Sequence, residues 1–246
     1  MTNNYLQKFS FVEPQIKETP NPNVGLFVVI PCFDEPDLIS TLQSLNNCDR
    51  PKLDVEIITV INAGKNTDSS IKQRNSETLI RAKNWAIENT KEGFTFLFLE
   101  QQNLPEKHAG VGLARKIGMD EAVHRIDQLQ LVDAPIICFD ADTTCDRNHL
   151  VEIEKAFKAN PTAKGASIYF EHPITGAEFD PFVYQSIIDY ELHLRYYKNA
   201  FEFTSHPQAC YTIGSSMAVM SSAYQSQGGM NKRKAGEDFY FMQKIV

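Results

Sequence analysis

The feature that most constrains the fold of this chain is a continuous apolar run at residues 25–30, which Pro31 closes. A run without polar alternation predicts a strand buried on both faces, as in a parallel sheet. Helical periods and further apolar runs then alternate. The expected strands are residues 25–30, 55–61, 94–99, 135–139 and 166–170, and the expected helices are residues 38–45, 71–87, 111–129, 150–157 and 181–197. This alternation predicts an α/β fold with a Rossmann-like, mostly parallel central sheet flanked by helices.

The chain divides by pattern into an arm and one large domain. Residues 1–23 are polar, carry three prolines and have no regular period, so we expect an arm that is partly disordered or packed on the surface. Residues 24–246 form the domain. Its first part, 24–142, keeps the regular alternation, whereas 143–246 is less regular and predicts a smaller mixed region.

Composition narrows the class of protein. The net charge of -7 argues against broad binding of nucleic acid, so we expect no nucleic-acid partner. The five cysteines form no CxxC pair, which indicates neither a zinc site nor a disulfide framework and favours a reducing, cytoplasmic compartment. The apolar runs are far shorter than a membrane span, so we expect no transmembrane segment. Peripheral membrane association stays compatible with these features.

Two acidic pairs are candidates for chemistry. Asp140-Ala141-Asp142 follows an apolar strand, and carboxylates at the end of a strand suit Mg²⁺ or Mn²⁺, which keep positions for substrate phosphates. Glu237-Asp238 precedes an apolar run that predicts a helix, where Asp238 could act as a general base. Both pairs also have a plain interpretation, as a solvated turn and as acidic residues complementing a helix dipole.

Two other segments have two interpretations. Residues 108–118 open a helix with glycines, which either approach a phosphate or allow close helix packing. The predicted helix that Asp180-Pro181 caps is rich in aromatic residues, for which we expect core packing rather than an acceptor groove. These aromatic residues are Phe182, Tyr190, Tyr196, Tyr197, Phe201 and Phe203.

Four segments, taken in order, resemble the motifs of the family 2 glycosyltransferases of the GT-A fold. They are residues 29–35, residues 112–118, the Asp140-Ala141-Asp142 triplet, and residues 228–230 followed by Glu237-Asp238. The resemblance implies metal-dependent transfer of a sugar, with inversion, from a UDP- or GDP-linked donor to a hydroxyl of a carbohydrate or lipid-linked acceptor. It makes 24–142 the nucleotide-binding half and 143–246 the acceptor-side half.

The resemblance also implies roles for individual residues. Asp140 and Asp142 would bind Mn²⁺ or Mg²⁺, and Asp238, with Glu237 beside it, would be the catalytic base. The residues expected at the nucleotide sugar are Pro31, Phe33, Glu35, Asn62, Arg115, Asp140 and Ala141.

Three departures from the family pattern matter. Asn62-Ala63 stands where the family has an acidic pair, so the identity of the nucleotide base stays open. Asp34 replaces the usual asparagine of the first turn. The chain ends at Val246, and because family members generally continue, we expect a truncated acceptor-side half.

Three alternatives stay open from the sequence. A retaining GT-A enzyme would keep the metal motif without using Asp238 as a base. A nucleotidyltransferase should carry a glycine-rich basic loop after the first strand, where this chain has Cys32-Phe33-Asp34-Glu35. A non-catalytic protein that binds sugar nucleotides would show metal-dependent binding without transfer.

Overall fold

The computed structural model describes residues 3–245, which form one six-stranded sheet flanked by helices. The strand order is β3-β2-β1-β4-β6-β5, with β1–β4 parallel and β6 antiparallel to both β4 and β5. The strands are β1 (Val24–Cys32), β2 (Asp54–Gly64), β3 (Phe94–Leu104), β4 (Pro135–Cys138), β5 (Gly165–Ser167) and β6 (Met217–Met220). The predicted α/β fold with a mostly parallel sheet is confirmed.

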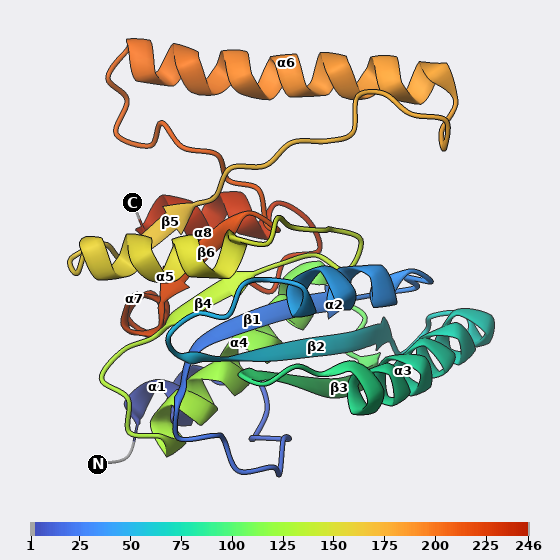
Figure 1. Cartoon of the computed structure of the whole chain (residues 1–246), viewed down its shortest axis with the longest axis vertical. Coiled ribbons are helices and arrows are strands. Elements are labelled where there is room, and N and C mark those ends of the chain that lie inside the picture. The colour runs from blue at the N-terminus through green and yellow to red at the C-terminus, as the bar shows by residue number, and fades with distance from the viewer. Residues whose placement is uncertain (1–2, 246) are drawn as a thin grey trace.

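Helices cover both faces of the sheet (Figure 1). The helices are α1 (Asn4–Phe9), α2 (Leu38–Asn46), α3 (Ser69–Asn89), α4 (Val111–Gln128), α5 (His149–Ala159), α6 (Pro181–Phe203), α7 (Ser221–Ser226) and α8 (Glu237–Ile245). The core on one face joins α1, α4, α7 and α8 to the sheet, and the core on the other face joins α2, α3 and α5 to it. Successive side chains of β1 enter opposite cores, as a strand buried on both faces requires.

Several elements differ from the sequence expectation. The short α1, α7 and β6 were not predicted, and β5 is three residues long instead of the five expected over 166–170. Part of the arm is helical and packed, because Tyr5 and Ile16 are buried in the core. None of the helices described within residues 3–245 is both long and apolar enough to cross a lipid bilayer.

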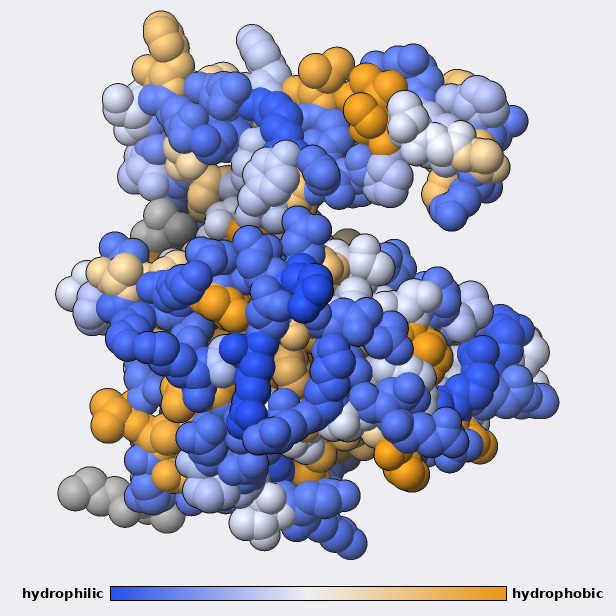
Figure 2. Space-filling view, in the orientation of Figure 1, coloured by the Kyte–Doolittle hydropathy of each residue, from blue (hydrophilic) through white to orange (hydrophobic). Residues whose placement is uncertain are grey.

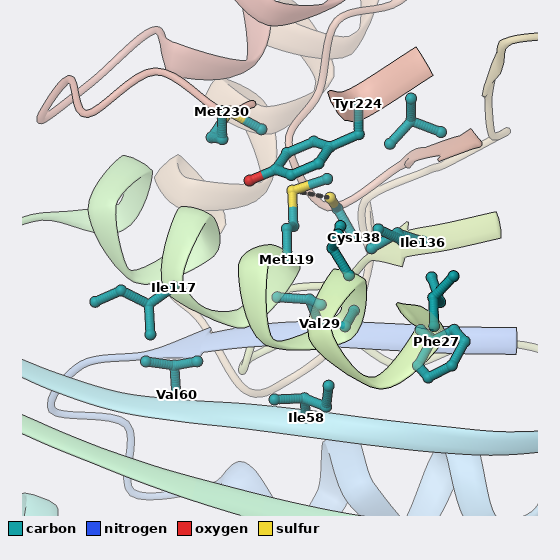
Figure 3. Packing of buried hydrophobic residues seen from close by; sticks show 14 of the residues in the cluster. Phe27, Val29, Ile58, Val60, Ile117, Met119, Ile136, Cys138, Tyr224 and Met230 are labelled. Atoms are coloured by element: carbon teal, nitrogen blue, oxygen red, sulfur yellow. Dashed lines mark hydrogen bonds between the residues drawn. The ribbon is translucent and has the colours of Figure 1, made fainter. Parts of the chain in front are cut away.

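Helix α4 is enclosed on nearly all sides, with fourteen of its eighteen residues buried. Figure 3 shows Ile117 and Met119 of this helix among the sheet residues Val29, Val60 and Cys138. Gly118 permits the close approach, since a Cβ placed there would lie 2.5 Å from Val29 Cγ1. The close-packing interpretation of the glycine-rich helix is therefore confirmed.

A buried ion pair attaches α4 to β2, and we expect its loss to be costly. Arg125 Nη2 donates to Glu56 Oε1 at 2.6 Å, and both side chains are almost fully buried. Arg125→Met leaves Glu56 charged and unpaired, so the free energy of unfolding should fall by about 3–5 kcal/mol. Urea titration monitored by circular dichroism measures this change.

The control is Arg147→Met, which removes an arginine–aspartate pair that is largely exposed to solvent. An exposed pair contributes about 0–1 kcal/mol. Equal losses in the two variants would show that the buried pair does not anchor α4.

Candidate active site

The carboxyl ends of the parallel strands meet at one edge of the sheet, which is where open α/β folds bind ligands. A cavity of about 310 Å³ lies at this edge, beside the start of α4. It is lined by Pro31, Phe33, Asn62, Gly64, Thr67, Glu106, Ala109, Gly110, Val111 and Lys234. We call it the edge cavity. Three of the residues expected at the nucleotide, Pro31, Phe33 and Asn62, come together in it.

Two charged residues of the edge cavity were missed from the sequence. Glu106 Oε1 and Lys234 Nζ lie 3.7 Å apart across it, although 128 positions separate them in the chain. Glu106 supplies a carboxylate close to Asn62, where the family pattern had led us to expect an acidic pair and none was found. The basic run 232–234, which ends three positions before Glu237, was the one signal in the sequence that could have identified Lys234.

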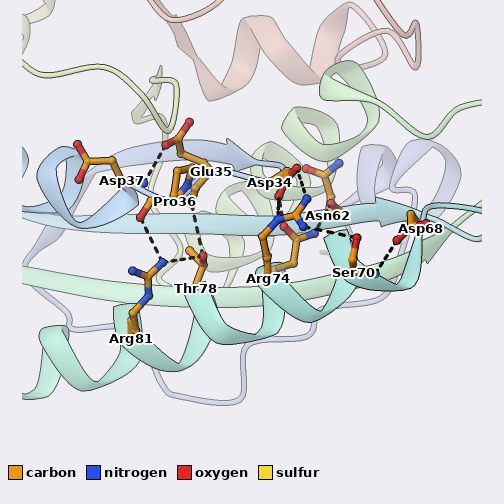
Figure 4. A network of polar contacts seen from close by, with 11 residues as sticks. Asp34, Glu35, Pro36, Asp37, Asn62, Asp68, Ser70, Arg74, Thr78 and Arg81 are labelled. Carbon is orange, nitrogen blue, oxygen red and sulfur yellow. Dashed lines mark hydrogen bonds and ion pairs between the residues drawn. The ribbon is translucent and has the colours of Figure 1, made fainter. Parts of the chain in front are cut away.

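The turn after β1 is held by a polar network (Figure 4). Asp34 adopts a left-handed conformation with φ 52°, which aspartate tolerates better than most residues. Arg74 grips its carboxylate through two hydrogen bonds of 2.7 and 2.8 Å, and this pairing lowers the pKa of Asp34. Asn75 accepts from the Asp34 amide and donates to the carbonyl of Asn62, which ties the ends of β1 and β2 together.

Glu35 lies apart from the edge cavity. It borders a neighbouring hollow that also contains Arg74 and Arg81, and its carboxylate accepts from the backbone amide of Asp37 at 2.8 Å. The structure therefore separates Glu35 from Pro31, Phe33 and Asn62. Its expected contact with the nucleotide stays a prediction.

The Asp140-Ala141-Asp142 segment forms a turn just beyond β4, at the same edge of the sheet. Thr41 of α2 donates a hydrogen bond of 2.7 Å to the carbonyl of Ala141, and this bond holds the turn against α2. Asp140 is half-buried, whereas Asp142 is exposed. The turn thus offers one anchored and one accessible carboxylate.

Arg115 joins this turn to the start of α8. Its Nη2 donates to Asp140 Oδ1 at 2.7 Å and its Nη1 donates to Glu237, while the side chain is only 1% exposed. Gly214 leaves room for it, because a Cβ there would lie 2.8 Å from both terminal nitrogens. The two acidic motifs, 97 positions apart in the chain, are therefore brought together by one buried cation.

This placement changes the interpretation of Arg115. A side chain that is closed off from solvent and paired with two carboxylates positions those carboxylates and does not line the edge cavity. Burial raises the pKa of Asp140 and of Glu237, and the positive charge of Arg115 counteracts that rise at both. Arg115 thus acts on the site through its neighbours.

Asp238 lies beside Arg115's carboxylate partners but outside their pairing. Its negative charge reaches Asp140 and Glu237, where it contributes to raising both pKa values. It is half-buried, and its Oδ1 accepts from the amide of Phe239 at 2.7 Å. Asp238 has no ion-pair partner among the residues described.

The carboxylates of Asp140 and Asp142 can bind a divalent cation only if substrate phosphates supply further ligands. Within residues 3–245, no group of three or more His, Cys, Asp and Glu side chains gathers to enclose a metal. One oxygen of Asp140 is taken by Arg115, which leaves its second oxygen and the exposed carboxylate of Asp142. Mg²⁺ is commonly bound by one or two carboxylates together with substrate phosphates, and this donor set matches that form.

The expectation of core packing for the aromatic helix is wrong. Asp180 caps α6 as predicted, but none of the helix's 23 residues is buried. Tyr196 is 75% exposed and Phe203 92% exposed. Figure 1 shows α6 standing apart from the sheet on two extended segments, and Figure 2 shows hydrophobic side chains on the surface of this layer. The periodicity of the sequence identified the helix, but it could not show that the helix would lie away from the sheet.

A second cavity, of about 410 Å³, lies between α6 and α8. We call it the aromatic cavity, because Tyr197, Phe201, Tyr211 and Phe239 contribute to its lining. Phe239 directly follows Asp238, so this cavity adjoins the candidate base. His206, for which the sequence indicated no role, also lines it.

Comparison with known proteins supports the fold. No protein-family model and no curated protein sequence matches this chain. Three similar solved structures are of S. aureus TarS 1-349, alone (TM-score 0.54, 13% identity), with UDP-GlcNAc (0.54, 14%) and with UDP (0.55, 12%). Each match covers 90% of this chain and 55%, 53% and 55% of the TarS chain, so this chain spans about half the length of those it matches.

TarS is a family 2 glycosyltransferase. The similarity over 90% of this chain shows that it has a GT-A-like fold, with a mostly parallel sheet flanked by helices.

The bridging role of Arg115 leads to a test by double substitution. Arg115→Met leaves Asp140 and Glu237 facing each other without a cation, so the free energy of unfolding should fall by about 3–5 kcal/mol. Adding Glu237→Gln removes one of the facing charges and should recover part of the loss, with a coupling of about 1–3 kcal/mol. Urea denaturation of the four proteins of the cycle measures both quantities.

Arg50→Met is the matched control, because Arg50 also pairs with two carboxylates but is 42% exposed. Because solvent screens an exposed pair, we expect the loss of stability in Arg50→Met to be much smaller than in Arg115→Met. Strict additivity of Arg115→Met and Glu237→Gln would contradict the bridge.

Proposed function

We propose that this chain is the catalytic part of a metal-dependent glycosyltransferase that transfers a sugar, with inversion, from a nucleoside-diphosphate sugar to an acceptor hydroxyl. The observation that supports this most strongly is the buried Arg115, which holds Asp140 and Glu237 together at the carboxyl edge of a GT-A-like sheet. Asp142 and Asp238 directly follow, or lie within two residues of, the two carboxylates that Arg115 joins.

The donor nucleotide would occupy the edge cavity. Phe33 is 51% exposed beside it and can stack on a base, while the Asn62 amide and the Glu106 carboxylate can hydrogen-bond the base or the ribose. Lys234 supplies positive charge for the diphosphate. The TarS structures with UDP and UDP-GlcNAc support a UDP-linked donor.

Asp140 and Asp142 would hold Mg²⁺ or Mn²⁺ together with the diphosphate. When bound there, the ion supplies Lewis-acid stabilisation of the negative charge on the departing nucleoside diphosphate. Thr41 and Arg115 keep the two aspartates in place, since they fix the carbonyl of Ala141 and one oxygen of Asp140.

Asp238 would be the general base. Its carboxylate accepts the proton of the acceptor hydroxyl while that oxygen forms a bond to the anomeric carbon, and the bond from this carbon to the phosphate oxygen breaks. A single displacement inverts the anomeric carbon and needs no covalent intermediate. The acceptor, a carbohydrate or a lipid-linked sugar, would reach Asp238 through the aromatic cavity, whose rings can pack against sugar faces.

Substitution of the two aspartates should separate binding from transfer. Asp142→Ala removes the accessible carboxylate and should abolish the Mn²⁺-dependent part of UDP binding, measured by isothermal titration calorimetry. Asp238→Asn keeps the size of the side chain but cannot take a proton, so binding should persist while transfer falls by about 10²–10⁴-fold.

Asp146→Ala, which removes another exposed carboxylate of the same loop, is the control and should leave both measurements unchanged. Full transfer by Asp238→Asn, or a product with retained anomeric configuration by NMR, would exclude the inverting mechanism. Metal-dependent binding without transfer of any donor sugar would instead indicate a non-catalytic binding protein.

The position of Lys234 predicts a specific loss of nucleotide affinity. A charge-assisted hydrogen bond contributes about 1.5–3 kcal/mol, so Lys234→Gln should weaken UDP binding by about tenfold or more. Lys52→Gln, at an exposed lysine far along the chain, should change it less than about twofold. A thermal-shift panel of UDP, GDP and their sugars in Mn²⁺ measures both variants, and UDP should stabilise the wild type most. An unchanged affinity of Lys234→Gln for UDP would contradict binding of the nucleotide in the edge cavity.

A further inference from the structure

A fourth hollow, of about 360 Å³, is lined by residues of α1, α4 and α8 and by residues 228–232. Four lysines from four separate segments line it: Lys8, Lys116, Lys232 and Lys244. No aspartate or glutamate is among its described lining residues. Such a gathering of cations is unexpected in a chain of net charge -7. We call it the lysine pocket.

The floor of the lysine pocket is rigid. Lys116 is buried and pairs with Asp120 at 3.1 Å, and Asp120 also accepts hydrogen bonds from the hydroxyls of Tyr5 and Tyr224 at 2.6 and 2.7 Å. Gly229, with φ 80°, lies directly against this group, since a Cβ there would be 2.1 Å from the Tyr5 hydroxyl. The buried network fixes the shape of the pocket before any ligand binds.

The rim carries ammonium groups that lack a carboxylate partner, although Lys244 Nζ donates to Asn231 Oδ1 at 3.4 Å. Lys8, Lys232 and Lys244 have no ion-pair partner among the residues described, whereas Lys116 has Asp120. The side-chain nitrogen of Asn231, another lining residue, is buried without a hydrogen-bond partner. Buried donors are almost always paired in proteins, so an unpaired amide nitrogen beside three ammonium groups without a carboxylate partner favours an acceptor from outside the chain.

We propose that the lysine pocket binds a phosphate-bearing ligand at a site separate from the edge cavity. Phosphate oxygens accept from ammonium groups and from an amide nitrogen, and each of these donors is present. The volume lies within the range of small-molecule sites and exceeds what a single ion needs. The ligand is an oligophosphate, a phosphorylated small molecule or a lipid headgroup, and these share the same chemistry.

The lysine pocket and the edge cavity share one segment of chain. Residues 231–234 cross the start of α4, where a Cβ on Gly112 would meet the carbonyl oxygens of Asn231 and Arg233. Lys232 enters the lysine pocket and Lys234 enters the edge cavity. An anion held by Lys232 therefore restrains the segment that presents Lys234.

Tripolyphosphate is the probe for this site, titrated by calorimetry at constant ionic strength in EDTA and without any sugar nucleotide. The double variant Lys8→Gln/Lys244→Gln should raise its dissociation constant at least tenfold. Lys17→Gln/Lys83→Gln removes the same charge from exposed lysines elsewhere and should change it less than twofold. Because no donor or metal is present, failure of the proposed glycosyltransfer does not affect this outcome.

Three results would overturn the proposal: no binding to the wild type at millimolar concentration, equal weakening in the two double variants, or loss of binding in Lys234→Gln alone. A second readout is acetylation of lysines by an N-hydroxysuccinimide ester, followed by mass spectrometry. Tripolyphosphate should protect Lys8, Lys232 and Lys244, and unprotected lysines would count against the site.

Vesicles distinguish the sources of the phosphate. If the protein sediments with phosphatidylglycerol vesicles, the double variant Lys8→Gln/Lys244→Gln and added tripolyphosphate should each abolish this sedimentation. That result would assign the site to a lipid headgroup. Absence of sedimentation, with tripolyphosphate still bound, would assign it to a soluble phosphorylated ligand.

Discussion

The rest of the structure depends on the pairing of the charged side chains of α4. This helix is surrounded by other parts of the protein on nearly all sides. The buried charged residues are Arg115, Lys116, Asp120, Glu121 and Arg125. A buried charge is costly unless it is paired and hydrogen-bonded. Their partners lie in the N-terminal arm, β2, the turn after β4, α7 and α8. Satisfying these charges therefore fixes the positions of five distant segments around one helix.

The same requirement assembles the candidate site. Arg115 needs both Asp140 and Glu237 to offset its burial, and this brings the metal-type turn and the start of α8 to one place. The parallel strands independently deliver Phe33 and Asn62 to the adjoining edge of the sheet. Rigid elements thus position the groups that would bind the donor, while Asp142 is exposed and Asp238 is half-buried without an ion-pair partner among the residues described.

The aromatic helix α6 shows where reasoning from pattern fails. Apolar residues at helical spacing indicate a face that needs a partner, and in most globular proteins the partner is the core. Here the flanking segments 168–180 and 204–216 hold the helix away from the sheet, and its inner side borders the aromatic cavity instead. A helix that packs on the core and a helix that packs elsewhere have the same pattern of residues. The pattern shows that one face of the helix is apolar, but not which part of the protein covers that face.

The sequence by itself determined the parallel sheet, the order of its main strands and helices, and the acidic turn at the end of β4, because continuous apolar runs and local capping signals act over a few residues. Only the tertiary structure decided that Arg115 is a buried bridge, that Glu106 and Lys234 face each other, and that four lysines share one pocket. Each of these arrangements includes residues more than a hundred positions apart, and electrostatic pairing depends on distance in space, which no local pattern encodes.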